Sequence, residues 1–498
     1  MIFSGKKTNI KELVFIALLL LPLFLINVRK SHDWGGDFAL YIKQGMNIID
    51  GKPQGDNGYV FNEYFPYLAP PTYSVGFPLL LAPVYGCFGN SILHFSLYLT
   101  VLLIAALLAF YFFFRMYYSV VVSSVAVIVI AYNPWLLWFK CEILSDIPFA
   151  LFVMLSLIGY LKTNWEDKSY KNAVLIGLLC GYALLIKSIG IVLLAAFCLD
   201  NAYAIFNDHK NKRGYVRLWN VASILGSALF IYILLSKVVF PGKADSYSFF
   251  STLFTLDNIG DTMLSTSNYY IQVFQDFFHP QAGQWNFVPL IVKAFALSFF
   301  LLGILLKLVQ QRSVIDYILL LYLTIVICFP NTTQGFRYLF PLCGIIFYYI
   351  IYAFQSIRLE ASISSSMIAC LIGVVVLLTY KHAAMELINT QDSILMGPQE
   401  PEAIEAFAYV RDHVPAEEVL VFNKPTVSSL YAGKNSVGYH RDQDSLSMEK
   451  KFAELNVHYV LECVDLKTSA LDAYLERHKE ALDTIFTNAK FKLYKQRR

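Results

Sequence analysis

Long apolar runs separated by short polar connections fill most of this chain. A helix needs about 20 apolar residues to cross a bilayer. The pattern therefore predicts a polytopic α-helical membrane protein with eleven spans, near residues 11–28, 91–114, 119–138, 146–162, 172–186, 188–206, 218–239, 287–306, 314–330, 338–355 and 363–383. The first run follows Lys6 and Lys7 and lacks a small-residue cleavage site, so we expect it to remain as an anchor.

The apolar stretch 172–206 has two interpretations, because Lys187 interrupts it. One long helix would place this lysine near the middle of the membrane, where a charge is costly. A hairpin of two helices would place it at the outer rim. Both interpretations remain open at this point.

Positive charge indicates the orientation of the spans, since Lys and Arg collect in short cytoplasmic connections. With the N-terminus inside, those connections hold Lys11, Arg115, Lys162, Lys168, Lys171 and Lys307. Eleven spans then place the C-terminus outside, together with two long outer loops, 29–90 and 240–286. We therefore expect a transmembrane domain, 1–394, and an outer domain, 395–498.

The final 104 residues differ from the rest, since they hold 30 of the chain's 75 Asp, Glu, Lys and Arg residues. Helical periods at 400–414, 445–455 and 469–480 alternate with strand-like runs at 419–422, 459–461 and 491–494. This alternation predicts a small α/β domain. Its charges are mixed in sign, so we expect it to shape access of the acceptor and not to carry the chemistry.

Composition agrees with a membrane protein, since 57% of residues are hydrophobic and only 15% are charged. A net charge of +3 gives no reason to expect a nucleic-acid partner. The eight cysteines show no CxxC spacing, and no P-loop, GxSxG or HExxH motif occurs. The histidines are scattered. No cofactor is predicted, and a divalent cation has no ligand cluster to support it.

Asp37 is the first candidate for chemistry. It follows two glycines and precedes a short amphipathic stretch, 38–49, which predicts a helix lying on the membrane surface. A carboxylate at the mouth of a membrane cavity can act as a general base. The competing interpretation is that Asp37 only caps this helix.

Glu142 and Asp146 form a second acidic motif at the outer start of a span. On a helix their i,i+4 spacing would place both on one face. They could flank an acceptor together with Asp37. Ser145 or Asp146 could instead be a helix cap.

Lys187 and Arg337 lie at predicted outer helix ends. Cations there can bind a phosphate whose lipid tail stays in the bilayer. They could equally extend to lipid headgroups as simple anchors.

Several motifs, taken in order, resemble the GT-C superfamily of membrane glycosyltransferases. The resemblance is to the family 39 type, the polyprenyl- or dolichyl-phosphate-sugar transferases related to protein mannosyltransferases and to the aminoarabinose transferase of lipid A. It is carried by Gly35 to Tyr41, Tyr73 to Leu80, Glu142 to Phe152, Gly181 to Gly190 and Gly335 to Pro341. Several relatives have an Asp-Glu pair in the first loop, whereas here Phe38 follows Asp37.

The resemblance implies transfer of a sugar from a polyprenyl-phosphate donor to a glycan, glycolipid or protein hydroxyl, on the outer side of a bacterial inner membrane. Asp37 would be the base, and Lys187 and Arg337 would bind the donor phosphate. A flippase or exporter of lipid-linked saccharides is the main alternative, but it would tend to carry ionisable residues deep in several helices. A membrane scaffold that uses its tail for binding is the third.

Overall fold

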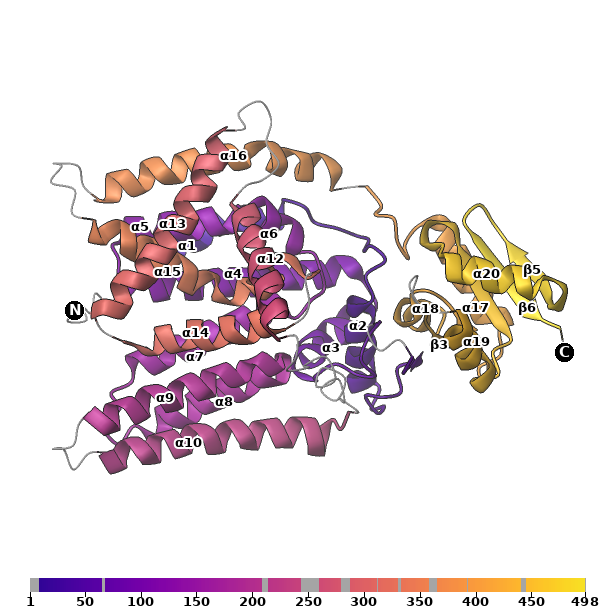
Figure 1. Cartoon of the computed structure of the whole chain (residues 1–498), viewed down its shortest axis with the longest axis horizontal. Coiled ribbons are helices and arrows are strands. Elements are labelled where there is room, and N and C mark those ends of the chain that lie inside the picture. Colours follow the sequence, from indigo (N-terminus) through magenta and orange to yellow (C-terminus); the bar gives the residue numbers. More distant parts are fainter. Residues whose placement is uncertain are drawn as a thin grey trace.

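The computed structural model describes residues 9–64, 68–207, 214–242, 259–278, 287–310, 312–329, 333–357, 365–391, 393–439 and 445–497. Lys6, Lys7 and most of the predicted outer loop 240–286 lie outside these ranges. Figure 1 shows a body of long helices with a smaller α/β domain at one end. The N-terminus lies at the opposite end of the body.

Each predicted apolar run contains a helix. The helices are α1 (Ile10–Leu20), α4 (Ile92–Arg115), α5 (Val120–Ala131), α7 (Asp146–Lys162), α8 (Tyr170–Ile186), α9 (Ile191–Asn207), α10 (Gly214–Ile233), α13 (Phe287–Gln310), α14 (Val314–Cys328), α15 (Cys343–Ser356) and α16 (Ser365–Thr390). Within the described residues, five helical segments are long and apolar enough to cross a membrane, and five apolar helices are shorter. Eleven crossings therefore stay a prediction.

The predicted run 119–138 does not form one helix. The helix α5 ends at Ala131, and a separate short helix, α6 (Pro134–Phe139), follows. The Asn133 side chain accepts a hydrogen bond from the Trp135 amide at 2.9 Å, which caps α6. Pro134 then occupies the first position of α6, where its missing N–H costs nothing.

Lys187 breaks the stretch 172–206 into two helices. Its backbone is extended, with φ −144° and ψ 133°, between α8 and a 3₁₀ turn at Ser188–Gly190. Figure 1 shows α8 and α9 side by side, so the chain reverses here. Gly76 permits close packing against the end of α8, because an added Cβ would lie 2.6 Å from the Leu185 carbonyl carbon. The single-helix interpretation is wrong.

The outer segments hold more helix than the sequence suggests. The predicted amphipathic helix is α2 (Asp37–Ile49), but α3 (Gly76–Phe88) and α12 (Ile259–Phe277) were not predicted. The Pro- and Gly-rich sequence of the α3 region hides a helix that keeps Pro83 in its interior. Phe38, Ala39 and Ile42 of α2 are fully buried, and α2 lies between the body and the C-terminal domain (Figure 1).

The C-terminal domain contains a six-stranded sheet in the order β1-β3-β2-β4-β6-β5. The strands are β1 (Tyr59–Val60), β2 (Val419–Val421), β3 (Asn435–Val437), β4 (Tyr459–Cys463), β5 (Leu482–Thr487) and β6 (Phe491–Gln496), and the helices are α17 (Pro401–His413), α18 (Pro425–Tyr431), α19 (Ser445–Glu454) and α20 (Ser469–Arg477). The edge strand β1 comes from the first outer loop and pairs in parallel with β3. The domain is thereby joined to the loop that carries Asp37.

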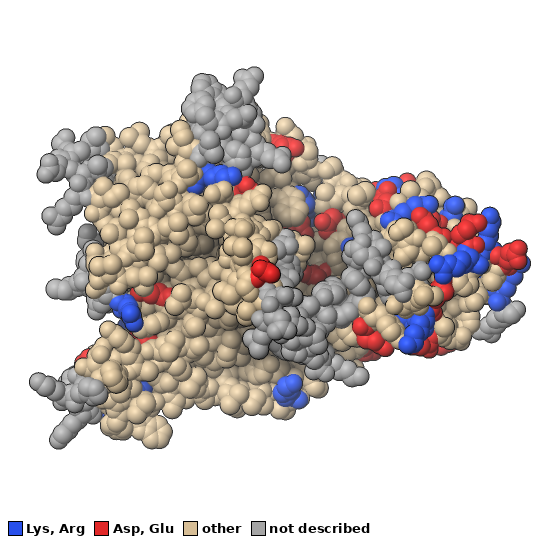
Figure 2. Space-filling view, viewed as in Figure 1, with Lys and Arg blue, Asp and Glu red and all other residues tan. Residues whose placement is uncertain are grey.

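Aromatic packing strengthens this junction. Trp34, only 6% exposed, inserts from the first loop among Phe407, Phe422 and Phe491, with ring centroids 5.9–6.3 Å away. Figure 2 shows charged side chains crowded over the C-terminal domain, while this face of the body carries only scattered ones. The polar surface and the apolar body therefore meet where α2 lies.

Candidate active site

Asp146 lies at the centre of a charged cluster where α7 begins. Its side chain is fully buried and accepts hydrogen bonds from Lys187 Nζ and, at 3.2 Å, from Arg337 Nε. The break between α8 and α9 positions Lys187. A 3₁₀ turn, Gly335–Tyr338, positions Arg337 after Gly335, whose φ of +59° favours glycine. Two cations, each 17% exposed, are thus held together by one fully buried acid.

Asp37 joins this cluster from α2. The helix cap is Gly36, and the Asp37 side chain makes no capping hydrogen bond. One carboxylate oxygen accepts a hydrogen bond from the Tyr73 hydroxyl at 2.7 Å, and the other lies 3.5 Å from an Arg337 nitrogen. The side chain is 33% exposed, whereas that of Asp146 is 0% exposed. The capping interpretation is wrong, and Asp37 is the accessible carboxylate of the cluster.

Aromatic rings line the cluster. The rings of Tyr41 and Tyr73 stack with centroids 4.3 Å apart, and the Tyr41 hydroxyl lies 3.2 Å from Ser145 Oγ. Burial, together with the charge of Asp37, raises the pKa of Tyr73. Tyr73 therefore remains a neutral donor that orients the Asp37 carboxylate.

Glu142 does not share a face with Asp146, contrary to the prediction. Residues 140–145 form a turn in which the Leu144 amide donates to the Glu142 carbonyl at 2.8 Å, and α7 begins only at Asp146. The i,i+4 relation requires a continuous helix, which is absent here. Glu142 instead lies 3.7 Å from Arg29 and 3.3 Å from His32 Nε2.

His32, Asp33 and Glu142 form a second cluster, which sequence spacing did not reveal. One ligand atom from each lies within 4.8 Å of the others, close enough to hold a divalent cation. A protonated His32 between the two carboxylates accounts for the same arrangement, since its Nδ1 lies 3.0 Å from Asp33. Burial lowers the pKa of His32, but the hydrogen bond with Asp33 and the charge of Glu142 outweigh burial, so the pKa is raised.

The raised pKa of His32 predicts a stability that depends on pH. Its contribution is complete below the ordinary pKa of 6.5 and is lost as pH rises through the higher pKa of the folded protein. We expect the melting temperature to fall as the pH rises from 6.5, the ordinary pKa of histidine, into the alkaline range, and to fall less in His32→Gln. Thermal unfolding of both proteins across this range is the measurement. Parallel pH curves for the two proteins would contradict the assignment.

The C-terminal domain also contributes to this region, through residues that the sequence did not single out. Thr426 of α18 donates a hydrogen bond at 2.9 Å to the carbonyl of Gly36, directly before Asp37. Lys424 precedes α18 and interacts electrostatically with Asp33 and Asp37. Burial lowers the pKa of Lys424, and these two carboxylates oppose that shift. The C-terminal domain therefore places residues of its own next to the Asp37 site.

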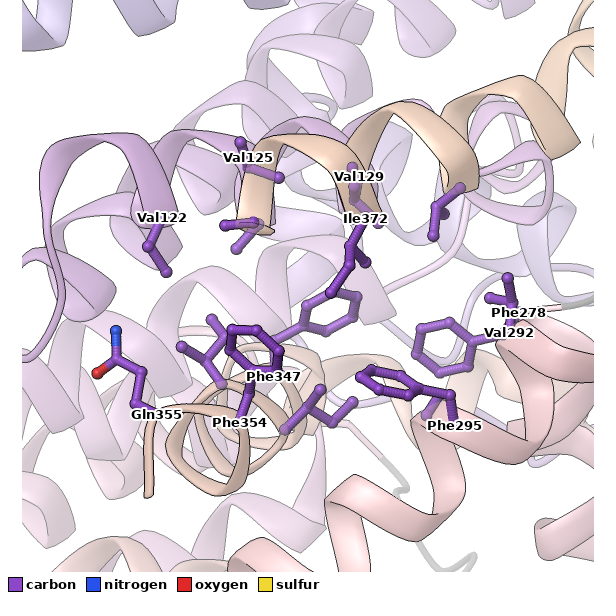
Figure 3. Close-up of a pocket in the computed structure, with 17 residues that line it drawn as sticks. Val122, Val125, Val129, Phe278, Val292, Phe295, Phe347, Phe354, Gln355 and Ile372 are labelled. Carbon is purple, nitrogen blue, oxygen red and sulfur yellow. The ribbon is translucent and has the colours of Figure 1, made fainter. Parts of the chain in front are cut away.

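An apolar groove lies within the helical body, close to the charged cluster. It is lined mainly by side chains of α5, α13, α15 and α16 (Figure 3). Phe278 lines one end and Gln355 the other. Phe277, next to Phe278, stacks on Phe336 at 3.8 Å, and Phe336 directly precedes Arg337. The groove therefore ends close to the cationic side of the cluster.

Three solved structures with a similar fold are distant from this chain in sequence. The Archaeoglobus fulgidus oligosaccharyltransferase in complex with Zn and sulfate is 14% identical, with a TM-score of 0.59 over 98% of this chain and 73% of its own. The same organism's AglB, with an inhibitory peptide and a dolichol-phosphate, is 13% identical, with a TM-score of 0.56 over 92% and 69% of the two chains. ArnT from Cupriavidus metallidurans, bound to undecaprenyl phosphate, is 10% identical, with a TM-score of 0.56 over 98% of both chains.

No protein-family model and no curated protein sequence matches this chain. The likeness is therefore one of fold, and it extends through the helical body and the C-terminal domain. The oligosaccharyltransferase and ArnT are both GT-C proteins. The predicted resemblance is confirmed at the level of the fold: the chain shares the fold of these GT-C proteins.

Proposed function

We propose that this protein is an integral membrane glycosyltransferase that moves a sugar from a polyprenyl-phosphate donor to an acceptor hydroxyl. The observation that carries the proposal is the pairing of one accessible carboxylate, Asp37, with a buried two-cation cluster, Lys187 and Arg337. A base and a phosphate-binding site lie side by side there, where the apolar body meets the polar domain. Transfer from a lipid phosphate needs both.

The proposed reaction is an inverting displacement. Asp37 takes the proton of the acceptor hydroxyl, and the freed oxygen attacks the anomeric carbon of the donor sugar. The bond from that carbon to the phosphate oxygen breaks, and the polyprenyl phosphate leaves with the electron pair. Lys187 and Arg337 stabilise the negative charge that develops on the leaving phosphate.

The groove in Figure 3 is the proposed site for the isoprenoid tail of the donor. Its lining is almost entirely apolar. The stacked rings of Phe277 and Phe336 connect its Phe278 end to Arg337. A tail in the groove would therefore bring the phosphate to the cations. Similar solved structures with dolichol-phosphate and undecaprenyl phosphate support a lipid-phosphate donor.

We further propose that the reaction occurs on the outer side of a bacterial inner membrane, with the N-terminus inside. The Arg115 side chain binds Glu12 at 3.1 Å, so the start of α1 and the end of α4 lie together. The C-terminal domain lies at the opposite end of the body (Figure 1). Acceptors would then be outer glycans, glycolipids or proteins. The similar oligosaccharyltransferase has been solved with an acceptor peptide tethered to it.

Changing Lys187 or Arg337 to Gln should weaken use of the donor. A hydrogen bond to a charged group contributes about 1.5–3 kcal/mol, so binding should fall by roughly 10- to 150-fold. Asp146 keeps one cationic partner in either variant. The measurement is the KM for the donor, with the exposed Lys52→Gln as the control. Unchanged KM in both variants would mean that these residues are only structural.

Mass spectrometry of cell-envelope glycans, glycolipids and glycoproteins, with and without this protein, tests the proposed function. We expect one sugar to be missing from one class of acceptor when the protein is absent. The lipid-linked donor should accumulate at the same time. Loss of complete saccharide chains, with the donor intact, would favour an exporter of lipid-linked saccharides instead.

A further inference from the structure

The cations around Asp37 differ in how their charge is compensated. Lys187 and Arg337 both pair with Asp146, and Arg337 also binds Gln334 at 3.0 Å. Asp37 and Asp146 together balance these two cations. Arg29 and His32 likewise balance Glu142 and Asp33. These eight residues therefore bring no net positive charge to an arriving phosphate.

Among the described residues, Lys424 lacks such a direct acidic partner. Its charge acts on Asp33 and Asp37, yet within the described part of the chain no carboxylate lies within ion-pair distance of its ammonium group. The residue is half-buried, so it carries a cost of desolvation that no direct partner offsets. A cation with this surplus charge beside the accessible carboxylate is suited to an anionic ligand.

The backbone that carries Lys424 is firmly held. The Thr426 hydroxyl binds the Gly36 carbonyl, and the Gln399 side chain accepts a hydrogen bond from the His32 amide at 2.8 Å. Gly397 packs so closely on the first loop that an added Cβ would lie 2.0 Å from the His32 carbonyl oxygen. With Trp34 inserted in the domain core, these contacts fix the position of Lys424 relative to Asp37.

We propose that Lys424 is a substrate-binding residue of the Asp37 site, supplied by the C-terminal domain, and that it binds the phosphate of the lipid carrier. This inference rests on the proposed function and extends its phosphate site from two cations to three. Lys187 and Arg337 hold the phosphate from the membrane side, and Lys424 holds it from the outer side. Donor binding then requires the C-terminal domain to be docked on the first loop.

Binding of undecaprenyl phosphate to the full-length protein in nanodiscs of zwitterionic lipid tests this inference. The variants are Lys424→Met, Lys424→Arg and, as the matched control, Lys479→Met, which removes an exposed lysine of the same domain. We expect Lys424→Met to weaken binding about tenfold or more, and Lys424→Arg to retain most of it. Lys479→Met should bind as the unmodified protein does. Limited proteolysis checks that the domain stays docked, and Lys424→Gln replaces the Met variant if docking is lost.

Arg337→Gln separates this inference from the function on which it rests. If Arg337→Gln weakens binding and Lys424→Met does not, the role of Lys424 is overturned while the proposed function stands. If undecaprenyl phosphate binds equally to the unmodified protein and to Arg337→Gln, the proposed phosphate site itself is wrong, and the role of Lys424 falls with it. Equal loss in the Met and Arg variants of Lys424 would also overturn a role based on charge.

Discussion

Replacing Asp37 by Asn should reduce sugar transfer by on the order of 100-fold or more, because the side chain keeps its shape but loses its basicity. The amide can still accept the hydrogen bond from Tyr73, so the local packing is retained. Binding of the donor should change much less than the rate of transfer. The measurement is kcat with saturating donor and acceptor.

The matched control is Asp50→Asn, which removes a more exposed carboxylate at the other end of the same helix. This variant should transfer at the normal rate. Full activity in Asp37→Asn would exclude Asp37 as the base. A loss caused only by unfolding would appear as a lower melting temperature, which we do not expect from this substitution.

Replacing Asp146 by Asn should have the largest effect on stability. The carboxylate is fully buried between Lys187 and Arg337, so its neutralisation leaves two cations without their main partner. Breaking a buried ion pair by removing one member costs about 3–5 kcal/mol. Chemical or thermal unfolding in detergent should show this loss, together with loss of transfer.

A second substitution tests the cause of that loss. Combining Asp146→Asn with Lys187→Met removes one of the stranded charges, so stability should recover in part. The double variant should nevertheless remain inactive, because a phosphate-binding cation is gone. Additive destabilisation by the two substitutions would contradict a direct coupling between Asp146 and Lys187.

The sequence predicted the helical body well, because a membrane span leaves a strong apolar signal. Its errors have local causes. Asn133 and Pro134 end one run early, and a Pro-rich segment hides α3. The break at Lys187 was one of two predicted forms of the stretch 172–206, because a lysine in the middle of the membrane is costly.

The site was predicted only as separate residues. Asp37, Asp146, Lys187 and Arg337 were each identified, but no sequence spacing shows that Asp146 lies between the two cations. Those contacts join residues 41 and 191 positions apart. Lys424 and the cluster around His32 carry no motif, and their roles depend on how the C-terminal domain docks. Long-range packing of this kind cannot be inferred from a single sequence.

One measurement tests the central claim most directly. Cells that lack the protein are complemented with the unmodified form, with Asp37→Asn or with Asp50→Asn, and both the polyprenyl-phosphate-linked sugar and the modified acceptor are quantified by mass spectrometry. We expect Asp37→Asn to accumulate the lipid-linked sugar and to lack the modified acceptor, while the other two forms restore normal levels. Restoration of the modified acceptor by Asp37→Asn, or unchanged lipid-linked sugars in cells without the protein, would contradict a glycosyltransferase centred on Asp37.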